Sequence, residues 1–208
     1  MKSSLLFLPL AAGLTLLAAC SDKKDDPTPA PAALTTETVS NLAAGVAVPS
    51  GGGQPVVSSK YTLYSFATNA VVPNSDSATT KWDLGFRGTT IIVNGGASGP
   101  GQAGALVQSG LFADLTTAPE TGYGVDSPTA KAIPTGSGNG WYSYNSSTNI
   151  ITPIAGKVLL VRTATGKFAK VEIVSYYQGA PATPTATSVS RYYTFRRVYQ
   201  PDGSRNLK

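Results

Sequence analysis

The chain has no histidine, and among its 208 residues it has only one cysteine, Cys20, and one methionine, Met1. The part of the chain after Cys20 therefore carries no imidazole, thiol or thioether group. These absences exclude Ser-His-Asp and Cys-His catalysis, zinc sites made of histidine and cysteine, and thiol redox chemistry. No Asp/Glu pair has a setting that indicates glycoside hydrolysis. We therefore expect a protein that is not an enzyme and that has no metal site of its own.

The beginning of the chain has the pattern of an export signal. Lys2 is followed by an apolar run, Leu5–Ala19, which is shorter than a comfortable bilayer span. The run ends in Leu-Ala-Ala-Cys at residues 17–20, which resembles the bacterial lipobox, where the cysteine becomes the acylated first residue. The alternative is an ordinary signal peptide with a chance cysteine at its end. We expect a lipoprotein signal peptide at 1–19.

The residues that follow have the composition of a tether. Ser21–Ala33 is charged and then rich in proline and alanine, so we expect a lipidated Cys20 and a flexible tether at 20–33, before a folded domain at 34–208. Acidic residues just after the cysteine resemble the signal that sends some lipoproteins to the outer surface, although an acidic tether also serves solubility. The expected location is the outer membrane, with the protein exposed at the cell surface and held in the bilayer through Cys20.

Charged residues are scarce, at 13% of the chain, and 16 basic residues face 11 acidic ones. This modest excess fits an acidic surface or a small anionic ligand better than nucleic acid. Residues 191–199 interleave arginines with tyrosines, as a platform for single-stranded nucleic acid does. The simpler interpretation, which we prefer, is a strand whose tyrosines pack and whose arginines reach water. We expect no nucleic-acid partner.

Glycine (22 residues) and proline (15) are plentiful, and with frequent Thr, Ser, Val and Tyr they favour strands and turns over helices. The clearest pattern is two strand-like runs, Val158–Arg162 and Lys167–Tyr177, on either side of a short connector that ends in Gly166. This pattern predicts a β-hairpin. The second run alternates apolar and charged residues, which predicts one buried face and one solvated face that carries Lys170 and Glu172.

Further strands are expected at residues 61–66, 81–87, 89–94, 141–144 and 191–199. In the strand at 81–87, Asp83 and Arg87 share the face opposite the apolar residues. We expect solvent exposure, or pairing with neighbouring strands, for these two side chains rather than a polar site. The chain is thus predicted to form a single all-β domain with long loops and little helix.

Several of these segments together resemble one known family. They are YTLYSF at 61–66, KWDLGFR at 81–87, IIVNGG at 91–96, GKVLLVRTATGKFAKVEIVSYY at 156–177 and RYYTFRRVYQPDGS at 191–204. The sequence resembles the HmuY family of outer-membrane lipoproteins of Bacteroidetes-type bacteria, over roughly residues 60–205. The resemblance implies strongly twisted antiparallel strands, a lipid anchor at the surface, and capture of haem for an outer-membrane uptake receptor.

The haem ligands of the family do not carry over to this chain. In haem-carrying relatives one histidine follows the tryptophan-containing strand, at a position that matches Asn145 or Ser146 here. The other lies in a longer insertion, for which residues 127–140 offer only Lys131, and the methionines that some relatives use are absent. Tyrosine is the remaining common axial donor. The resemblance places the candidate ligand site at Trp141, Tyr142, Tyr144, Asn145 and Ser146.

Three hypotheses follow from these observations. The leading one is a binder of haem or porphyrin that uses Tyr142, Tyr144 or other tyrosines, or that holds the macrocycle by stacking alone. The second is a HmuY-like surface module that binds a non-haem ligand or a protein partner. The third, and most remote, is a carboxylate-based hydrolase that depends on Asp83.

Overall fold

The computed structural model describes residues 33–47 and 56–208. The predicted signal peptide, the lipobox cysteine Cys20 and the tether up to residue 32 lie outside the described residues. Within the described part of the chain the regular structure is β-strand, apart from one short 3-10 turn, η1 (Asn74–Asp76). The all-β class predicted from composition and alternation is confirmed.

The larger sheet has five antiparallel strands in the order β1-β13-β12-β11-β8. Their bounds are β1 (Glu37–Ala43), β13 (Ser190–Gln200), β12 (Phe168–Tyr177), β11 (Lys157–Arg162) and β8 (Gly104–Ser109). The predicted hairpin lies within this sheet: β11 pairs with β12, with Arg162 opposite Phe168 next to the turn. Gly166 adopts a φ of 78° in that turn, which explains why a glycine separates the two runs.

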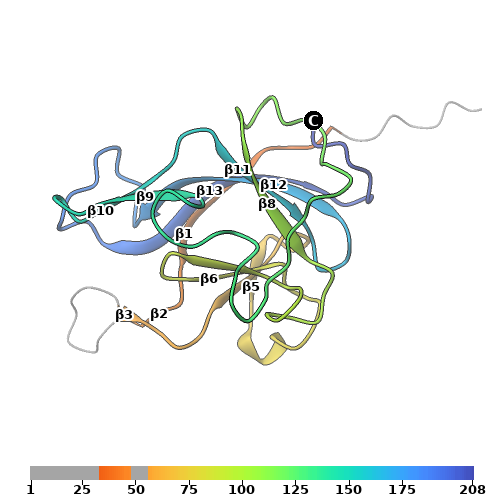
Figure 1. Cartoon of the computed structure of the whole chain (residues 1–208), viewed down its shortest axis with the longest axis horizontal. Helices are drawn as coiled ribbons and strands as arrows, with labels where there is room; N and C mark the ends of the chain where they lie inside the picture. The colour runs from red at the N-terminus through yellow and green to blue at the C-terminus, as the bar shows by residue number, and fades with distance from the viewer. Residues whose placement is uncertain (1–32, 48–55) are drawn as a thin grey trace, which may run out of the picture. The chain divides into compact units, whose positions relative to one another are not determined.

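A second antiparallel sheet packs on one face of the first (Figure 1). Its order is β5-β4-β6-β7, with the bounds β5 (Ala70–Val72), β4 (Thr62–Ser65), β6 (Leu84–Arg87) and β7 (Thr90–Val93). Aromatic rings fill the space between the sheets. The ring centroid of Phe195 in β13 lies 5.5 Å from that of Tyr64 in β4 and 5.8 Å from that of Phe86 in β6. Burial of such rings is the dominant stabilising contribution to this core.

The other face of the larger sheet is also covered, which the sequence did not lead us to expect. Phe112 and Leu207 pack there on Val158 and Leu160 of β11. Lys170 of β12 was predicted to face water, but the residue is only 3% exposed. Its ammonium donates hydrogen bonds to the carbonyl oxygens of Phe112, at 2.8 Å, and Leu115, at 2.9 Å. The prediction of a solvated face was wrong for Lys170 because a loop distant in sequence covers it.

Two further polar side chains are buried against expectation. Asp83 is 5% exposed, and its carboxylate accepts hydrogen bonds from the amides of Phe66, at 2.7 Å, and Ala164, at 2.9 Å. Arg197 of β13 is 4% exposed and donates to the carbonyl oxygen of Phe66 at 2.8 Å. Both side chains pair with backbone groups that lie outside regular strands and would otherwise be buried without partners. Arg87, by contrast, stays near the surface, 4.4 Å above the ring of Tyr61.

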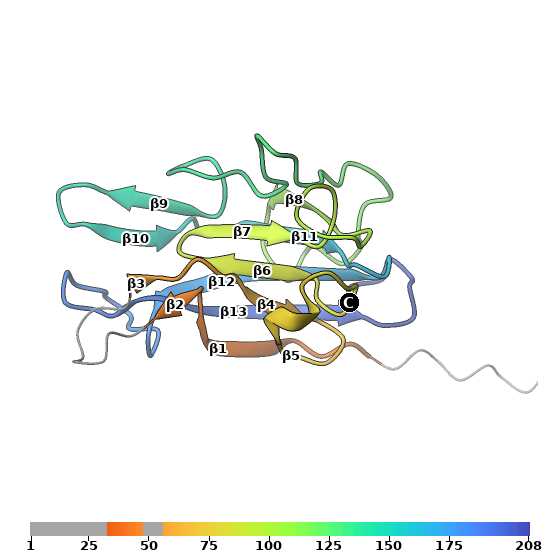
Figure 2. The ribbon, with the colours of Figure 1, turned by 90° about the horizontal axis from the view of Figure 1, so that it is seen from below.

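Two small hairpins complete the described strands. They are β9 (Tyr142–Asn145) with β10 (Ile150–Pro153), and β2 (Val46–Ala47) with β3 (Val56–Val57). Figure 2 shows the β9–β10 hairpin extending beyond the end of the two main sheets, at the same end as the long connection between β12 and β13. The amide of Ile151 in β10 donates a hydrogen bond to the phenol oxygen of Tyr177, at 3.0 Å, and so ties the hairpin to β12.

Candidate functional site

The candidate residues at the start of β9 lie in the core. Trp141 is 2% exposed and Tyr142 is 8% exposed. The indole ring of Trp141 lies 5.0 Å from the ring of Tyr193 and 5.8 Å from that of Tyr176, measured between centroids, and its N–H donates to the carbonyl oxygen of Thr89 at 3.1 Å. Trp141 therefore packs in the core at the base of the hairpin, where other aromatic side chains enclose its ring.

Tyr144 lies farther out along the hairpin and is 44% exposed. It pairs with Ile151 across the two strands, so both side chains project from the same face of the hairpin. The phenol of Tyr144 donates a hydrogen bond to the side-chain oxygen of Asn149, at 2.6 Å, and its amide donates to the hydroxyl of Ser137, at 2.8 Å. These contacts hold the ring in place at an accessible position.

Asn145 and Ser146 belong to the tip of the hairpin. The side-chain oxygen of Asn145 accepts hydrogen bonds from the amides of Ser147, at 2.9 Å, and Thr148, at 3.3 Å, which closes the turn. Asn145 projects from the face opposite Tyr144, because neighbouring residues of a strand alternate. Ser146 is exposed at the tip. The structure thus separates the candidate residues. Trp141 and Tyr142 are buried, Tyr144 and Asn145 lie on opposite faces of the hairpin, and Ser146 lies at its tip.

The connection between β12 and β13 runs beside the hairpin and forms a cleft with its Tyr144 face. This cleft has a volume of about 330 Å³. Its walls include Tyr144, Ile151, Tyr176, Tyr177, Ser190 and Arg191. A second cleft, of about 750 Å³, lies on the opposite face, where Asn145 and Ile150 meet Pro184 of the connection. Volumes in this range are typical of sites for small organic ligands.

Arg191, which sequence reasoning missed as a site residue, occupies an unusual backbone conformation. Its φ is 69°, a left-handed value that is rare for a residue with a side chain, and Ala180 at the other end of the connection has a φ of 46°. The strain coincides with a register shift between β12 and β13 at Ser175 and Tyr177. Strained residues of this kind gather at ligand sites more often than elsewhere. The aromatic pair that ends β12, followed by a proline-rich loop and an arginine, was the available sequence signal.

The cleft beside Tyr144 carries phenol, hydroxyl and amide groups and one guanidinium. Burial raises the pKa of the Tyr176 phenol well above its usual range, although the nearby charge of Arg191 acts in the opposite direction. Tyr176 is therefore a neutral group at physiological pH. In the described residues no three His, Cys, Asp or Glu side chains gather in a way that could hold a metal ion. The cleft is suited to binding through ring contacts, hydrogen bonds and one positive charge.

Comparison with known families decides which family this is. The family model described as "HmuY protein" matches residues 58–195, which is most of the described chain. The chain belongs to the HmuY family. The resemblance drawn from the sequence motifs is thereby confirmed. A comparison with curated proteins gives no match. Within the described residues no helix is long and apolar enough to cross a membrane.

Three solved structures are similar to this HmuY-family chain. A putative HmuY-like heme-binding protein from Bacteroides vulgatus is 17% identical, with a TM-score of 0.48 over 80% of this chain and 91% of that one. A putative lipoprotein from Bacteroides fragilis is 18% identical, with a TM-score of 0.46 and the same coverage of 80% and 91%. An apo HmuY analogue from Tannerella forsythia is 14% identical, with a TM-score of 0.45 over 81% of this chain and 96% of that one.

Proposed function

We propose that this HmuY-family protein is a lipid-anchored binding protein at the outer surface, without enzymatic activity, that captures haem or a related porphyrin for iron acquisition. The observation that carries the proposal is the cleft between the β9–β10 hairpin and the β12–β13 connection, where Tyr144, Tyr176 and Arg191 meet. Its position agrees with the place after the tryptophan-containing strand to which the family resemblance directs a ligand. An outer-membrane receptor that accepts the cargo is the partner that this role requires.

The chemistry of this cleft matches the two parts of a porphyrin. Aromatic and aliphatic side chains such as Tyr144 and Ile151 offer flat contact for the macrocycle. Arg191 offers a guanidinium that suits a propionate carboxylate, and the hydroxyl of Ser190 lines the same cleft. A haem iron carries its own redox and ligand-binding chemistry, and this chain would contribute its binding and orientation.

Tyr144 is the residue placed to hold an iron in this cleft. The phenol of Tyr144 is accessible and lies on the face of the hairpin that lines this cleft. Burial raises the pKa of Tyr176, which opposes its phenolate form. Ligation by Tyr144 requires the loss of its proton and of its hydrogen bond to Asn149. Without that step the macrocycle is held by stacking and by the Arg191 charge alone.

A haemin titration of the purified protein, followed by the Soret band, tests the proposal. We expect a shifted and sharpened band that saturates at one equivalent, and a weaker change in Tyr144→Phe. Tyr61→Phe is the matched control, because Tyr61 lies beneath Arg87 and lines neither hairpin cleft. A broad spectrum like that of free haemin would refute haem capture. Equal binding by the wild type and Tyr144→Phe would mean that the phenol is not the ligand.

Anchoring is tested separately, because it depends on residues outside the described structure. Cys20→Ser should release the protein from the membrane fraction and abolish incorporation of a labelled fatty acid. Protease added to intact cells should degrade the wild type if the domain is exposed at the surface. Membrane retention of Cys20→Ser would argue for an ordinary signal peptide and another means of attachment.

The larger cleft on the Asn145 face favours a second candidate function, the binding of a non-haem ligand or a protein partner. Its walls carry hydroxyl and amide side chains, including Asn145, Thr152 and Thr185, which suit a polar ligand better than a porphyrin. Thr152→Trp should fill this cleft and block binding of a neutral oligosaccharide. The same variant should leave the haemin titration unchanged, since Thr152 does not line the Tyr144 cleft.

The hydrolase hypothesis rests on Asp83, for which the hydrogen bonds of the carboxylate support a different role. Asp83 is 5% exposed, and the hydrogen bonds that its carboxylate accepts from the amides of Phe66 and Ala164 give it a structural role. Such a carboxylate organises the backbone around it. The proposed role of the protein is therefore binding.

A further inference from the structure

A pocket separate from both hairpin clefts lies beside the turn that joins β4 to β5. It has a volume of about 400 Å³ and shares no lining residue with either cleft. Its apolar wall is formed by Ala67, Val71, Val72 and Pro73. Val71 is 56% exposed, so this wall remains open to solvent along an edge strand of the smaller sheet. A mainly apolar pocket with a few converging polar groups is the usual form of a small-molecule site.

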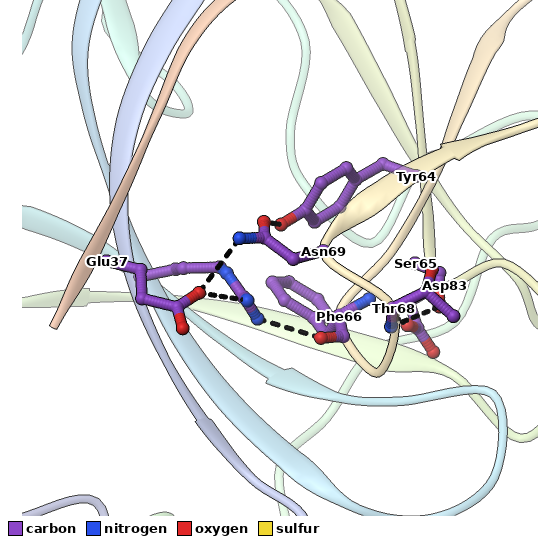
Figure 3. A network of polar contacts seen from close by, with 8 residues as sticks. Glu37, Tyr64, Ser65, Phe66, Thr68, Asn69 and Asp83 are labelled. Atoms are coloured by element: carbon purple, nitrogen blue, oxygen red, sulfur yellow. Dashed lines mark hydrogen bonds and ion pairs between the residues drawn. The ribbon is translucent and has the colours of Figure 1, made fainter. Parts of the chain in front are cut away.

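The turn that forms one side of this pocket is held firmly in place, as the close view in Figure 3 shows. Asp83 accepts a hydrogen bond from the amide of Phe66, and Ser65 accepts one from the amide of Thr68 at 3.4 Å. Asn69 accepts a hydrogen bond from the phenol of Tyr64 at 2.6 Å and donates one to Glu37 at 3.0 Å. The wall is thus preformed, and a ligand does not have to order it.

Two polar groups reach the pocket from its inner side. The carboxylate of Asp83 uses one acceptor site on each oxygen for the amides of Phe66 and Ala164, and an ionised carboxylate has about four such sites. Tyr199 lines the same pocket, and its hydroxyl makes no hydrogen bond with the described residues. Burial beside Asp83 raises the pKa of Tyr199, which keeps its hydroxyl protonated. Both groups therefore retain capacity to bind a polar atom.

The charge around this pocket is opposite in sign to that of the whole protein. The chain carries a formal charge of +5, but the lining residues of the pocket include Asp83 and Asp76 against one lysine, Lys81. Lys81 is paired with Asp76 at 3.1 Å, and Arg197, whose charge acts on Asp83 from the core, is paired with Glu37, which leaves the charge of Asp83 as the local excess. A negative group at the base of an apolar pocket selects for a cation with an apolar body.

We propose that this pocket is a second binding site, which takes a small organic cation, a primary amine on an aromatic or aliphatic body. The ammonium group would bind the free acceptor sites of Asp83 and the hydroxyl of Tyr199, and the body would contact Val71, Val72 and Pro73. Desolvation raises the pKa of Asp83, although its two amide hydrogen bonds and the charge of Arg197 act in the opposite direction, and an ammonium beside the carboxylate adds stabilisation that water cannot provide there. Such a ligand gains binding free energy from the polar groups of the pocket and from its apolar wall.

The test is a titration of the ¹⁵N-labelled protein with 2-phenylethylamine, followed through the backbone amide resonances. We expect saturable shifts at Phe66 and Ala164, whose amides bind Asp83, and at Val72. The neutral analogue 2-phenylethanol should bind roughly tenfold more weakly, because it lacks the charge. The anion 3-phenylpropionate should not bind. Equal shifts with all three compounds, or no saturable shift with the amine, would overturn the proposal.

Variants keep the test independent of folding. Asp83→Asn replaces one of the two side-chain oxygens that accept from the amides of Phe66 and Ala164 and can destabilise the fold, so the main variant is Val71→Trp, which fills the pocket from an exposed position. Its matched control is Val174→Trp, on an exposed position of β12 that does not line the pocket. Amine binding should be lost in the first and kept in the second, and Tyr199→Phe should weaken it. Undiminished binding by Val71→Trp would refute the site.

Discussion

The guanidinium of Arg197 donates a hydrogen bond to the carbonyl oxygen of Phe66, 2.8 Å away, and so joins the larger sheet to the β4–β5 turn of the smaller one. The same guanidinium forms an ion pair with Glu37 of β1. On the other side of the peptide unit, the amide of Phe66 donates to Asp83. Two buried charges from different parts of the chain thus satisfy the backbone of one residue just beyond the end of β4.

Arg197→Met should lower the free energy of unfolding by about 3 kcal/mol, because it leaves the buried carbonyl of Phe66 without a donor and removes the ion pair with Glu37. Glu37→Gln should cost less than about 1 kcal/mol, since Gln keeps a side-chain oxygen that accepts from Arg197 and the Glu37 side chain is 43% exposed. Urea unfolding of both variants measures the difference. Similar losses for the two would show that the ion pair, and not the contact to Phe66, is what matters.

The close packing of backbone around Gly95 predicts a strong effect of adding one methyl group. A Cβ at this position would lie 2.1 Å from the carbonyl oxygen of Ala103, a contact that no side chain tolerates. Gly95→Ala should therefore lower the free energy of unfolding by about 2–4 kcal/mol. Gly138→Ala is the control, because nothing lies within 4 Å of its Cβ and only its φ of 83° opposes the change. We expect a cost of about 1 kcal/mol there, and comparable melting temperatures would contradict this account.

What the sequence predicts well is local. The β11–β12 hairpin follows from two strand-like runs and a glycine in the turn, whereas its register, with Arg162 opposite Phe168, leaves Lys167 in the turn and not at the start of the second strand. The position of Tyr144 and Asn145 on opposite faces of β9 also follows from strand alternation, although the two were grouped as one site from the family resemblance. Secondary structure and side-chain faces depend on near neighbours.

What the sequence does not reveal comes from residues far apart in the chain. Lys170 is covered by a loop whose carbonyl groups lie 55 and 58 residues away, and Asp83 meets the amide of Ala164 at a separation of 81 residues. In the same way, Arg191 at the start of β13 lines a cleft with the hairpin residue Tyr144. Alternation of apolar and polar residues along one strand does not indicate which distant segment will cover that strand. The buried polar side chains were therefore expected at the surface, and the wall of the candidate site that contains Arg191 was missed.

The buried ammonium of Lys170 predicts a pH dependence of stability. Burial, and then the nearby charge of Arg196, lower the pKa of Lys170 below its ordinary value of 10.5. Between the two values the unfolded chain binds more protons than the folded one, so the free energy of unfolding rises with pH. Below the lowered pKa the full penalty is present. Wild type should therefore gain stability relative to Lys170→Met as the pH rises through the alkaline range.

Urea unfolding at a series of pH values measures this relative gain. Lys170→Met also loses the hydrogen bonds to Phe112 and Leu115, which changes its free energy of unfolding by the same amount at every pH. This loss therefore does not change the slope of the free energy of unfolding against pH. Lys157→Met, which removes a lysine from β11 that binds the hydroxyl of Ser109, is the control and should keep the slope of the wild type. Parallel curves for the wild type and Lys170→Met would show that Lys170 does not carry the effect.

The hydrogen bond from the amide of Ile151 to the phenol of Tyr177, at 3.0 Å, predicts how the hairpin is held over its cleft. Tyr177→Phe removes the acceptor and should raise the hydrogen-exchange rate of the Ile151 amide while lowering the global free energy of unfolding by only about 1 kcal/mol. Because the hairpin carries Tyr144, its looser attachment should also weaken haemin binding.

Tyr144→Phe is the matched control for this last change, since it removes the bond to Asn149 but leaves the Ile151 amide with its partner. Exchange at Ile151 should then stay slow, although haemin binding falls in both variants. Loss of haemin binding together with fast exchange at Ile151 in Tyr177→Phe would indicate that Tyr177 positions the hairpin. Loss of haemin binding with slow exchange at Ile151 in Tyr144→Phe would indicate that Tyr144 contacts the ligand directly. Unchanged exchange at Ile151 in Tyr177→Phe would mean that packing alone, and not this hydrogen bond, fixes the hairpin against β12.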